Sequence, residues 1–308
     1  MKKQQILDWL SEREQELGLD SPEIIRKKEG ESNHNFILES EEEKYVLRAS
    51  KQSSRKDRLR NESKALQLLE EKGIANVPRL KLYEKEREVG SVLVQSFVGR
   101  RDVERAGSLN LTQLRNLAML LGDIHSIDFG DSNEYFEGSK KESLQQLYGR
   151  DFERWSERPY REYLDNVEEP DERIQKFYRK QQELLEEVPD REVETSFIHS
   201  DLGFNIRTYG EKVFVVDWEY SEIGFHGHDL MILFEHGKLD QEQRQIFLDE
   251  YRKKKDLGEA FEEVREIHPK FLAFHDAVWA ARRNAQGENR HLLIERKIKK
   301  LEKLYGED

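Results

Sequence analysis

The stretch FIHSDLGFNIRTYGEKVFVVDWE, residues 197–219, carries carboxylates and an amide between two short runs of β-branched and aromatic residues. Both runs are typical of buried strands, and the segment between them is typical of a polar turn. Asp201, Asn205 and Asp217 are therefore expected to meet at one end of a hairpin. Carboxylate and amide oxygens suit Mg²⁺, which proteins usually share with the phosphates of a nucleotide. The spacing thus predicts phosphoryl transfer, in which an Asp accepts the proton of the attacking hydroxyl.

The elements that must position these residues are predicted from hydrophobic periodicity. Five runs rich in β-branched and aromatic residues are typical of strands, and turn residues separate them. They predict a small antiparallel sheet, with two strands in 23–39 around a turn at residue 30, and others at 43–50, 77–84 and 89–99. Leucines recur on one face of 55–72, which predicts a helix that Gly73 ends. The chain beyond residue 100 is mostly helical by the same criteria.

Composition limits the classes of function. Charged residues make up 38% of the 308 residues, against a usual quarter or so, and the net charge is −12. That charge disfavours nucleic-acid and membrane partners and favours a small neutral or cationic substrate. The chain has no Cys, which excludes disulfides, thiolate catalysis and Cys-based zinc sites. Residues 1–18 are amphipathic, with no apolar run long enough for a signal or a membrane span, so a cytoplasmic protein is expected.

The order of the motifs resembles that of the aminoglycoside phosphotransferase and choline kinase-like family, whose members are relatives of the protein kinases. The motif HSD at 199–201, the amide at 205 and the run VVDWE at 215–219 carry the resemblance, which extends over about residues 24–236. It implies an α+β, protein-kinase-like bilobal fold. A small five-stranded antiparallel N-terminal lobe with one helix would occupy 1–99, and a mainly helical C-terminal lobe would occupy 100–308.

The resemblance also implies an activity. Such proteins transfer the γ-phosphate of ATP or GTP, bound with Mg²⁺, to a hydroxyl of a small metabolite or an aminoglycoside-like acceptor. Asp201 would be the catalytic base, and Asn205 and Asp217 would be the metal ligands. His199 would hold the loop. The motifs do not encode the acceptor, although the net charge favours a cationic one.

In the small lobe, VLR at 46–48 resembles the kinase strand that packs an apolar side chain on the adenine and carries a phosphate-binding Lys two positions later. Val46 would pack on the adenine, and Arg48 would take the place of the Lys. Glu62 would pair with Arg48, which explains a charged residue on the apolar face of the helix. Taken alone, Glu62 would instead be expected at the edge of that face, in contact with water.

Two further segments are candidates for nucleotide binding. The turn GESNHNF resembles the family's nucleotide-covering turn, although a turn with one Gly is more often an ordinary hairpin. Its candidate residues are Gly30, Ser32 and Asn33. The segment VLVQSFVG resembles the crossing between lobes, whose backbone groups bond the adenine edge, and a plain buried strand is the alternative. The candidates there are Gln95, Ser96 and Phe97.

One departure from the family bears on activity. Family members usually have four residues between the catalytic Asp and the metal-binding Asn, whereas only Leu202, Gly203 and Phe204 intervene here. Either the loop is tightened, with unusual dihedral angles at Gly203, or Asn205 is displaced and metal binding weakens. The agreement of the other motifs favours the first outcome. The alternative function is a pseudokinase, a nucleotide-binding or protein-binding module without phosphotransfer.

Other groups have structural explanations. The cluster His226, His228, Asp229 and His236 could suggest a transition-metal site, but a helix cap or a support for the catalytic loop is the simpler role for Asp229. Packing is the expected role of several aromatic and polar side chains in the helical lobe, with a substrate pocket as the alternative. These are Trp155, Tyr160, Tyr163, Phe274, His275, Asp276 and Trp279.

Overall fold

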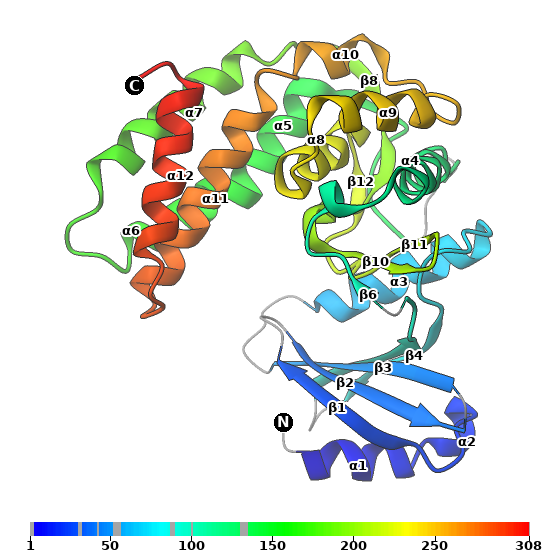
Figure 1. Cartoon of the computed structure of the whole chain (residues 1–308). Coiled ribbons are helices and arrows are strands. Elements are labelled where there is room, and N and C mark those ends of the chain that lie inside the picture. Colours follow the sequence, from blue (N-terminus) through cyan, green and yellow to red (C-terminus); the bar gives the residue numbers. More distant parts are fainter. Residues whose placement is uncertain are drawn as a thin grey trace.

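The computed structural model describes residues 3–29, 33–41, 43–51, 57–86, 90–99, 101–129 and 135–307. The nucleotide-contact predictions for Gly30 and Ser32 lie outside these residues. Figure 1 shows a small lobe built on a sheet and a larger lobe built mainly from helices, with helix α3 (Arg58–Glu71) between them. The α+β bilobal fold that the sequence predicts is therefore confirmed.

The small lobe is a five-stranded antiparallel sheet in the order β1-β2-β3-β5-β4. Its strands are β1 Glu23–Glu29, β2 Asn33–Ser40, β3 Glu43–Ser50, β4 Leu80–Glu86 and β5 Gly90–Ser96. Helices α1 (Lys3–Ser11) and α2 (Glu14–Leu17) lie along the outer face of the sheet (Figure 1). Apolar side chains of α1 pack there against Phe36 and Leu47.

Alternation along β3 decides which side chains face the large lobe. Successive side chains of a strand point to opposite faces of the sheet. Tyr45 and Leu47 belong to the cluster under the outer face, so Val46 and Arg48 point to the other face, toward α3. The register pairs Val46 with Gln95 of β5, and these two side chains therefore share the inner face.

Helix α3 contacts both lobes. Asp57 caps its N-terminus, because the carboxylate accepts a hydrogen bond from the N–H of Arg60. The helix ends shortly before Gly73, whose φ of +72° favours glycine. Leu66 and Leu69 belong to the same hydrophobic cluster as the core of the large lobe, while α3 also contacts the sheet. The hydrophobic cores do not separate at residue 99, so the proposed lobe boundary there remains a prediction.

The large lobe is mainly helical and has one core. Its helices are α4 Leu111–His125, α5 Leu144–Phe152, α6 Arg158–Leu164, α7 Glu172–Glu187, α8 His226–Gly237, α9 Gln241–Tyr251, α10 Gly258–Glu263, α11 His268–Ala285 and α12 His291–Leu304. Shorter turns are the 3₁₀ turns η1 (Ala106–Ser108) and η3 (Leu202–Phe204) and the π-helical turn η2 (Glu153–Glu157). Helix α11 packs against α6, α7 and α12, and α4 packs against α9.

Short strands in the large lobe carry residues 197–219, which contain the predicted base and metal ligands and are called the catalytic segment below. They are β6 Arg101–Asp102, β7 Lys141–Ser143, β8 Glu192–Glu194, β9 Ser196–Ile198, β10 Ile206–Tyr209, β11 Lys212–Val215 and β12 Glu222–Gly224. Strand β10 pairs with β11, and β9 pairs with β12. The sequence-based hairpin was wrong in this respect, because the segment taken as a polar turn contains β10, and β10 is the partner of β11.

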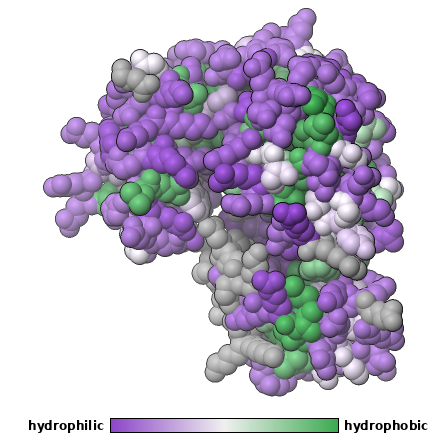
Figure 2. All heavy atoms as spheres, viewed as in Figure 1, coloured by the Kyte–Doolittle hydropathy of each residue, from purple (hydrophilic) through white to green (hydrophobic). Residues whose placement is uncertain are grey.

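The hydrophilic character of the surface agrees with the high proportion of charged residues. Figure 2 shows that hydrophilic residues cover most of one face of the molecule, which is hollowed between the lobes. A protein with 38% charged residues is expected to look like this. Across the described ranges, no helix has the length and apolar character needed to cross a membrane.

Candidate active site

The catalytic loop is fixed at its start by a buried carboxylate. Asp229 of α8 accepts hydrogen bonds from the N–H groups of His199 (Oδ2, 2.7 Å) and Ser200 (Oδ1, 2.8 Å). His125 Nε2 lies 3.2 Å from the same carboxylate. Burial alone would raise the pKa of Asp229, but the contacts with His125 and His199 lower it. Ser200 is thereby held at φ +63°, which a non-glycine residue adopts only when its surroundings stabilise it.

His199 joins two parts of the loop. Its Nε2 lies 2.9 Å from the carbonyl oxygen of Val216, and its Nδ1 accepts a hydrogen bond from the N–H of Asp201 at 3.2 Å. A neutral ring with its proton on Nε2 satisfies both bonds. Burial lowers the pKa of His199, which also favours the neutral form. The ring therefore ties Asp201 to the residue that precedes Asp217.

The shortened loop still returns Asn205 to Asp201. Turn η3 occupies the three intervening residues. Beyond it, Asn205 Nδ2 donates to the carbonyl oxygen (2.7 Å) and to Oδ2 (3.1 Å) of Asp201. The N–H of Val216 donates to the carbonyl oxygen of Asn205 at 3.0 Å, so Asn205 and Asp217 lie on adjacent segments. The structure thus brings together the three residues that the sequence singles out, as the tightened-loop alternative requires.

Gly203 serves this loop for a reason other than the one expected. Its φ lies outside the left-handed region, so the unusual dihedral angles predicted there are not found. Left-handed angles occur instead at Ser200 and at Asp217, where φ is +69°. A Cβ at Gly203 would lie 2.5 Å from the Cβ of His236 on α8. The ring of Phe204 also stacks on His236, with centroids 5.5 Å apart, so the short loop packs directly on α8.

Asp201 lies in an environment that favours its protonated form. Burial, and then the negative charge of Asp217, raise the pKa of Asp201 to about 8, while the hydrogen bond from Asn205 opposes them. A carboxyl that titrates near neutral pH can take up a proton during a reaction and release it afterwards. The environment of Asp201 therefore suits a general base.

Arg48 is surrounded by carboxylates. Its Nη1 lies 2.5 Å from Oε2 of Glu62 and 2.7 Å from Oδ1 of Asp217, and its Nη2 lies 3.1 Å from Oε2 of Glu219. Glu62 is 0% exposed, so the expected ion pair is present and Glu62 does not reach water. Burial lowers the pKa of Arg48, but these carboxylates outweigh burial and raise it. Burial raises the pKa of Glu62 despite Arg48, because one guanidinium serves three carboxylates.

Glu219 is a member of the site that the sequence analysis did not assign. Its Oε2 also accepts a hydrogen bond from Asn33 Nδ2 at 2.8 Å. The side chain of Asn33, which was expected to lie near nucleotide phosphates, is therefore buried and bonded to Glu219. No sequence pattern pointed to Glu219, because β11 ends at Val215 and Asp217 has a φ of +69°, so the alternation of side chains along a strand does not extend to it.

A cleft of about 500 Å³ lies between the sheet and the catalytic segment. The small lobe lines it with Val46, Arg48 and Gln95, and the large lobe lines it with Asn205 and Asp217. All of these residues were predicted from the sequence to contact a nucleotide or its metal. Glu62 lies behind Arg48 and does not line the cleft.

The predicted crossing segment also lines the cleft, but not all of its donors are open. The N–H of Ser96 donates to Arg79 and the N–H of Phe97 donates to Lys44, at 2.9 and 3.0 Å. These two N–H groups cannot bond a nucleotide base at the same time. Val98 follows in the lining of the cleft, and its N–H donates to no backbone carbonyl among the described residues. The sequence analysis missed this donor.

The donors at the floor of the cleft fit Mg²⁺. The side chain of Asp217 is 38% exposed and offers a carboxylate. Asn205 directs its Nδ2 to Asp201, which leaves its Oδ1 as an acceptor. Mg²⁺ needs only one or two such protein ligands beside phosphates and waters. Elsewhere, the described part of the chain has no group of three or more His, Asp or Glu arranged to hold a metal ion.

Sequence comparison places these observations in a family. The sequence profile described as the phosphotransferase enzyme family matches residues 23–267. The chain belongs to this family. The match covers the sheet, α3, the catalytic segment and most of the large lobe, so the residues described above all lie within it.

Individual proteins of known sequence match only part of the chain. A LicA homolog from Metamycoplasma hominis is 28% identical over 117 residues, 38% of this chain and 41% of that protein. A LicA homolog from Mycoplasma capricolum is 32% identical over 69 residues, 22% of this chain and 29% of that protein. The chain thus matches less than half the length of either curated relative.

Solved structures match over nearly the whole chain. Choline kinase from Cryptosporidium parvum has a TM-score of 0.72 at 15% identity, covering 99% of this chain and 96% of that one. Choline kinase LicA from Streptococcus pneumoniae has a TM-score of 0.65 at 17% identity, covering 98% and 99%. Spectinomycin phosphotransferase in complex with ADP and spectinomycin has a TM-score of 0.64 at 14% identity, covering 98% and 94%. At these identities the comparison establishes a shared fold.

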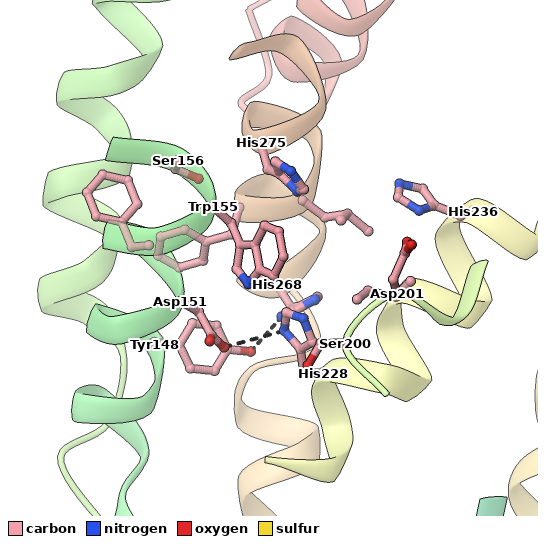
Figure 3. Close-up of a pocket in the computed structure, with 14 residues that line it drawn as sticks. Tyr148, Asp151, Trp155, Ser156, Ser200, Asp201, His228, His236, His268 and His275 are labelled. Carbon is pink, nitrogen blue, oxygen red and sulfur yellow. Dashed lines mark hydrogen bonds and ion pairs between the residues drawn. The ribbon is translucent and has the colours of Figure 1, made fainter. Parts of the chain in front are cut away.

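A second, smaller pocket lies beside Asp201 (Figure 3). The centres of water-sized groups can occupy about 60 Å³ of it. Side chains of α5, η2, α8 and α11 form most of its wall, which is rich in aromatic rings and imidazoles. Residues that matter below are Tyr148, Asp151, Trp155, His236, His268 and His275.

The structure shows where several ambiguous side chains lie. Trp155 and His275 line it, as the substrate-pocket alternative expected. Tyr160, Tyr163 and Phe274 are buried in the core, as packing predicts. Asp151 was not singled out from the sequence, because only the contacts of α5 with α8 and α11 bring its carboxylate to the pocket. Its position in a highly charged region gave no signal.

Proposed function

We propose that the protein is a small-molecule kinase that transfers the γ-phosphate of ATP or GTP to a hydroxyl of a small acceptor. One observation carries the proposal. Asp201 lines the small pocket, while Asn205 and Asp217, which are held beside it, line the large cleft. The base is thus located between a space of nucleotide size and a space for an acceptor. Because the chain matches only part of its curated relatives, the activity itself remains a proposal.

The cleft supports a nucleotide in a defined orientation. Val46 and Gln95 share the inner face of the sheet and suit the base, and Gln95 Oε1 is buried without a partner, so it can accept a hydrogen bond from an amino group. The open N–H of Val98 is a further donor for the edge of the base. Arg48 lies nearer Asp217 and is placed for the phosphates. Its guanidinium fork can bond phosphate while Glu62 holds it.

Asn205 Oδ1 and Asp217 would hold Mg²⁺ together with phosphate oxygens. When bound, the ion neutralises the charge that develops on the phosphates. An ion held at Asp217 would offset the negative charge of that residue, which is one of the causes that raise the pKa of Asp201, and would thereby favour the ionised form of the base. An Oδ of Asp201 accepts the proton of the acceptor hydroxyl as the hydroxyl oxygen attacks the γ-phosphorus. The bond from the γ-phosphorus to the β–γ bridging oxygen breaks, and the nucleoside diphosphate leaves.

The acceptor is proposed only by class. Structural neighbours include proteins described as choline, ethanolamine and spectinomycin kinases or phosphotransferases. The net charge of −12 favours a cationic acceptor. A cytoplasmic location, where nucleoside triphosphates are abundant, fits the same proposal.

Calorimetric titration of ATP and then GTP, each with and without Mg²⁺, tests the nucleotide half of the proposal. We expect Mg²⁺-dependent binding, weakened about 10-fold or more in Asp217→Ala because the metal loses a carboxylate. Asp123→Asn is the matched control, since Asp123 is a half-exposed Asp of α4 that pairs with Lys254. Nucleotide binding that is equally strong without Mg²⁺ and in Asp217→Ala would contradict the assignment of Asp217 as a metal ligand.

A turnover assay tests the second half of the proposal, which is phosphate transfer to a hydroxyl. Release of nucleoside diphosphate in the presence of a panel of small alcohols is expected for the wild type and the Asp123→Asn control. Nucleotide binding without transfer to any hydroxyl would favour the pseudokinase alternative. Absence of nucleotide binding would reject the kinase and favour the protein-binding form of the pseudokinase alternative.

A further inference from the structure

The side chain of Asn61 on α3 bonds the backbone that follows the predicted metal ligand Asp217. Its Nδ2 donates to the carbonyl oxygen of Ser221 at 2.9 Å and to that of Glu219 at 3.2 Å. Carbonyl oxygens only accept hydrogen bonds, so the nitrogen of this amide, and not its oxygen, must face them. One side chain of the helix between the lobes (Figure 1) therefore holds the backbone at two points just beyond Asp217.

The backbone that Asn61 holds is tightly turned. Asp217 has a φ of +69°, in the left-handed region, which a non-glycine residue keeps only when surrounding contacts fix it. Beyond it, the N–H and the Oγ of Ser221 both donate to the carbonyl oxygen of Trp218, at 3.2 and 2.7 Å. Trp218 is buried in the core of the large lobe. The turn that starts at Asp217 is thus fixed to the large lobe by Trp218 and to α3 by Asn61.

Tyr220, which lies between the two bonded carbonyls, is held by its side chain. The guanidinium carbon of Arg58, also on α3, lies 4.5 Å from the centroid of the Tyr220 ring, and Arg58 donates a hydrogen bond to the Tyr220 hydroxyl. The centroid of the same ring lies 5.0 Å from that of Trp155 in η2. Residues 219–221 therefore contact α3 through both their backbone and a side chain, and they contact η2 as well.

The bonds of Asn61 differ from those of Arg48 in how a ligand affects them. Arg48 bonds the carboxylates of Asp217 and Glu219, but it also lines the cleft, where phosphate oxygens would compete for its N–H groups. A metal ion would likewise compete with Arg48 for the carboxylate of Asp217. The amide of Asn61 is uncharged, bonds backbone carbonyls and lies outside the lining of the cleft. Its hold on the turn is therefore independent of whether nucleotide is bound.

We propose that Asn61 is a positioning residue for Mg²⁺, because it fixes the turn after Asp217 and thereby directs the Asp217 carboxylate at the metal. This inference rests on the proposed function and adds to it a residue that lies outside the cleft. Removing a group that orients a metal ligand typically weakens metal binding by about 10-fold or more. Since Asn61 acts through Asp217, its loss should reduce the gain in nucleotide affinity that Mg²⁺ provides. The affinity for metal-free nucleotide should change little.

The test compares the Kd of a non-hydrolysable ATP or GTP analogue, whichever binds better, with Mg²⁺ and with EDTA. Calorimetry measures both values, and the ratio of the Kd in EDTA to the Kd with Mg²⁺ is the Mg²⁺ enhancement. Asn61→Leu keeps the approximate size of the side chain and removes the amide. We expect it to lower the Mg²⁺ enhancement by about 10-fold and to leave the Kd in EDTA within about threefold of the wild type.

Two further variants separate positioning from folding. Asn61→Ser also removes the amide but leaves room for water to bond the freed carbonyl oxygens, so it is the milder change and should show the same pattern. Gln67→Leu is the matched control, because Gln67 is an exposed amide on the same helix, and its Mg²⁺ enhancement should equal that of the wild type. In a turnover assay, a 10-fold higher Mg²⁺ concentration should restore most of the rate that Asn61→Ser loses.

The outcomes distinguish this inference from the proposed function. An unchanged Mg²⁺ enhancement in both Asn61 variants, or an equal rise of the two Kd values, would overturn the positioning role and leave the kinase proposal intact. A reduced enhancement in a protein that transfers phosphate to no hydroxyl would support the positioning role and count against the kinase. A wild type that binds nucleotide equally well in Mg²⁺ and in EDTA would reject the metal site and the positioning role together.

Discussion

The two spaces that meet at Asp201 are built on different principles. On the nucleotide side, charges are paired within the protein, since Arg48 contacts Glu62, Asp217 and Glu219. On the side of the small pocket, burial raises the pKa of Asp151 to about 7, and its ion-pair contact among the described residues is with a histidine, His228. Buried polar atoms without hydrogen bonds occur on both sides, among them Gln95 Oε1 at the cleft and His268 Nε2 at the pocket. A paired network can hold its geometry before any ligand arrives, whereas unpaired groups are completed by the ligand.

The difference indicates which part of the molecule sets which property. In the proposed kinase, the nucleotide side would bind groups that every kinase reaction shares, so its geometry can be fixed in advance. The acceptor side would have to recognise one compound among many, and groups that only that compound satisfies give the sharpest discrimination. Mutations on the first side should therefore affect all acceptors alike, and mutations on the second side should change preference.

The strongest test of this comparison is a mutation of the residue that both spaces share. Asp201→Asn removes the proton acceptor but keeps the shape and the bonds to the loop. We expect kcat to fall on the order of 10³-fold for every acceptor, within the range of general-base contributions, while the Kd of Mg²⁺–nucleotide changes little. Steady-state kinetics and calorimetry of the same preparation measure both. A variant that retained near-normal kcat would show that Asp201 is not the base.

The next test breaks the paired network. Arg48→Met leaves Glu62 buried without its partner, so we expect the free energy of unfolding to fall by about 3 kcal/mol, as is typical when one partner of a buried pair is removed. Urea unfolding followed by fluorescence measures it. Replacing both residues, as in Arg48→Met with Glu62→Leu, should recover most of the loss.

Arg265→Met is the control for that test, because Arg265 is exposed and pairs with Glu262 at the surface. Exposed pairs contribute from nothing to about 1 kcal/mol. Equal losses in Arg48→Met and Arg265→Met would mean that the network at the nucleotide side does not stabilise the fold, and the contrast with the acceptor side would disappear.

A third test concerns the packing of the short loop. In Gly203→Ala the new Cβ would meet the Cβ of His236, so we expect a loss of about 1–2 kcal/mol in stability and weaker Mg²⁺ binding as Asn205 shifts. Gly149→Ala on α5 is the control, since nothing lies within 4 Å of a Cβ there, and it should be neutral or slightly stabilising. If both glycine variants behaved alike, close packing would not explain the loop.

The sequence predicted most of what depends on local pattern. The five strands and α3 followed from periodicity, and the Arg48–Glu62 pair followed from strand and helix order. Asn205 and Asp201 are four positions apart, so their contact required only a compact turn. The hairpin was wrong because β10, with the sequence IRTY, is short and partly polar, and it resembles a turn as closely as a strand.

The contacts that the sequence could not predict join segments that are far apart in the chain. Asn33 and Glu219 are 186 positions apart, and no local pattern indicates that they bond. Asp151 reaches the small pocket only because α5 contacts α8 and α11. The N–H groups of Ser96 and Phe97 are already bonded to the carbonyl oxygens of Arg79 and Lys44, which come from distant parts of the chain. Each of these contacts is decided by tertiary packing rather than by propensity.

The smallest expected effect is a pH dependence of the free energy of unfolding that arises from Asp201, the residue that lies between the two spaces. Its pKa is about 8 in the folded protein, against roughly 3.9 when unfolded. A group with a raised folded pKa favours folding fully below its unfolded pKa, and this contribution is lost as the pH rises through the folded pKa. Asp201→Asn should therefore gain stability relative to wild type as the pH rises from 5 to 9 without nucleotide. We expect a change of about 1 kcal/mol or more across that range, measured by urea unfolding at each pH. Asp123→Asn should show no such trend, and a pH-independent difference for Asp201→Asn would mean that Asp201 is already ionised in the free protein.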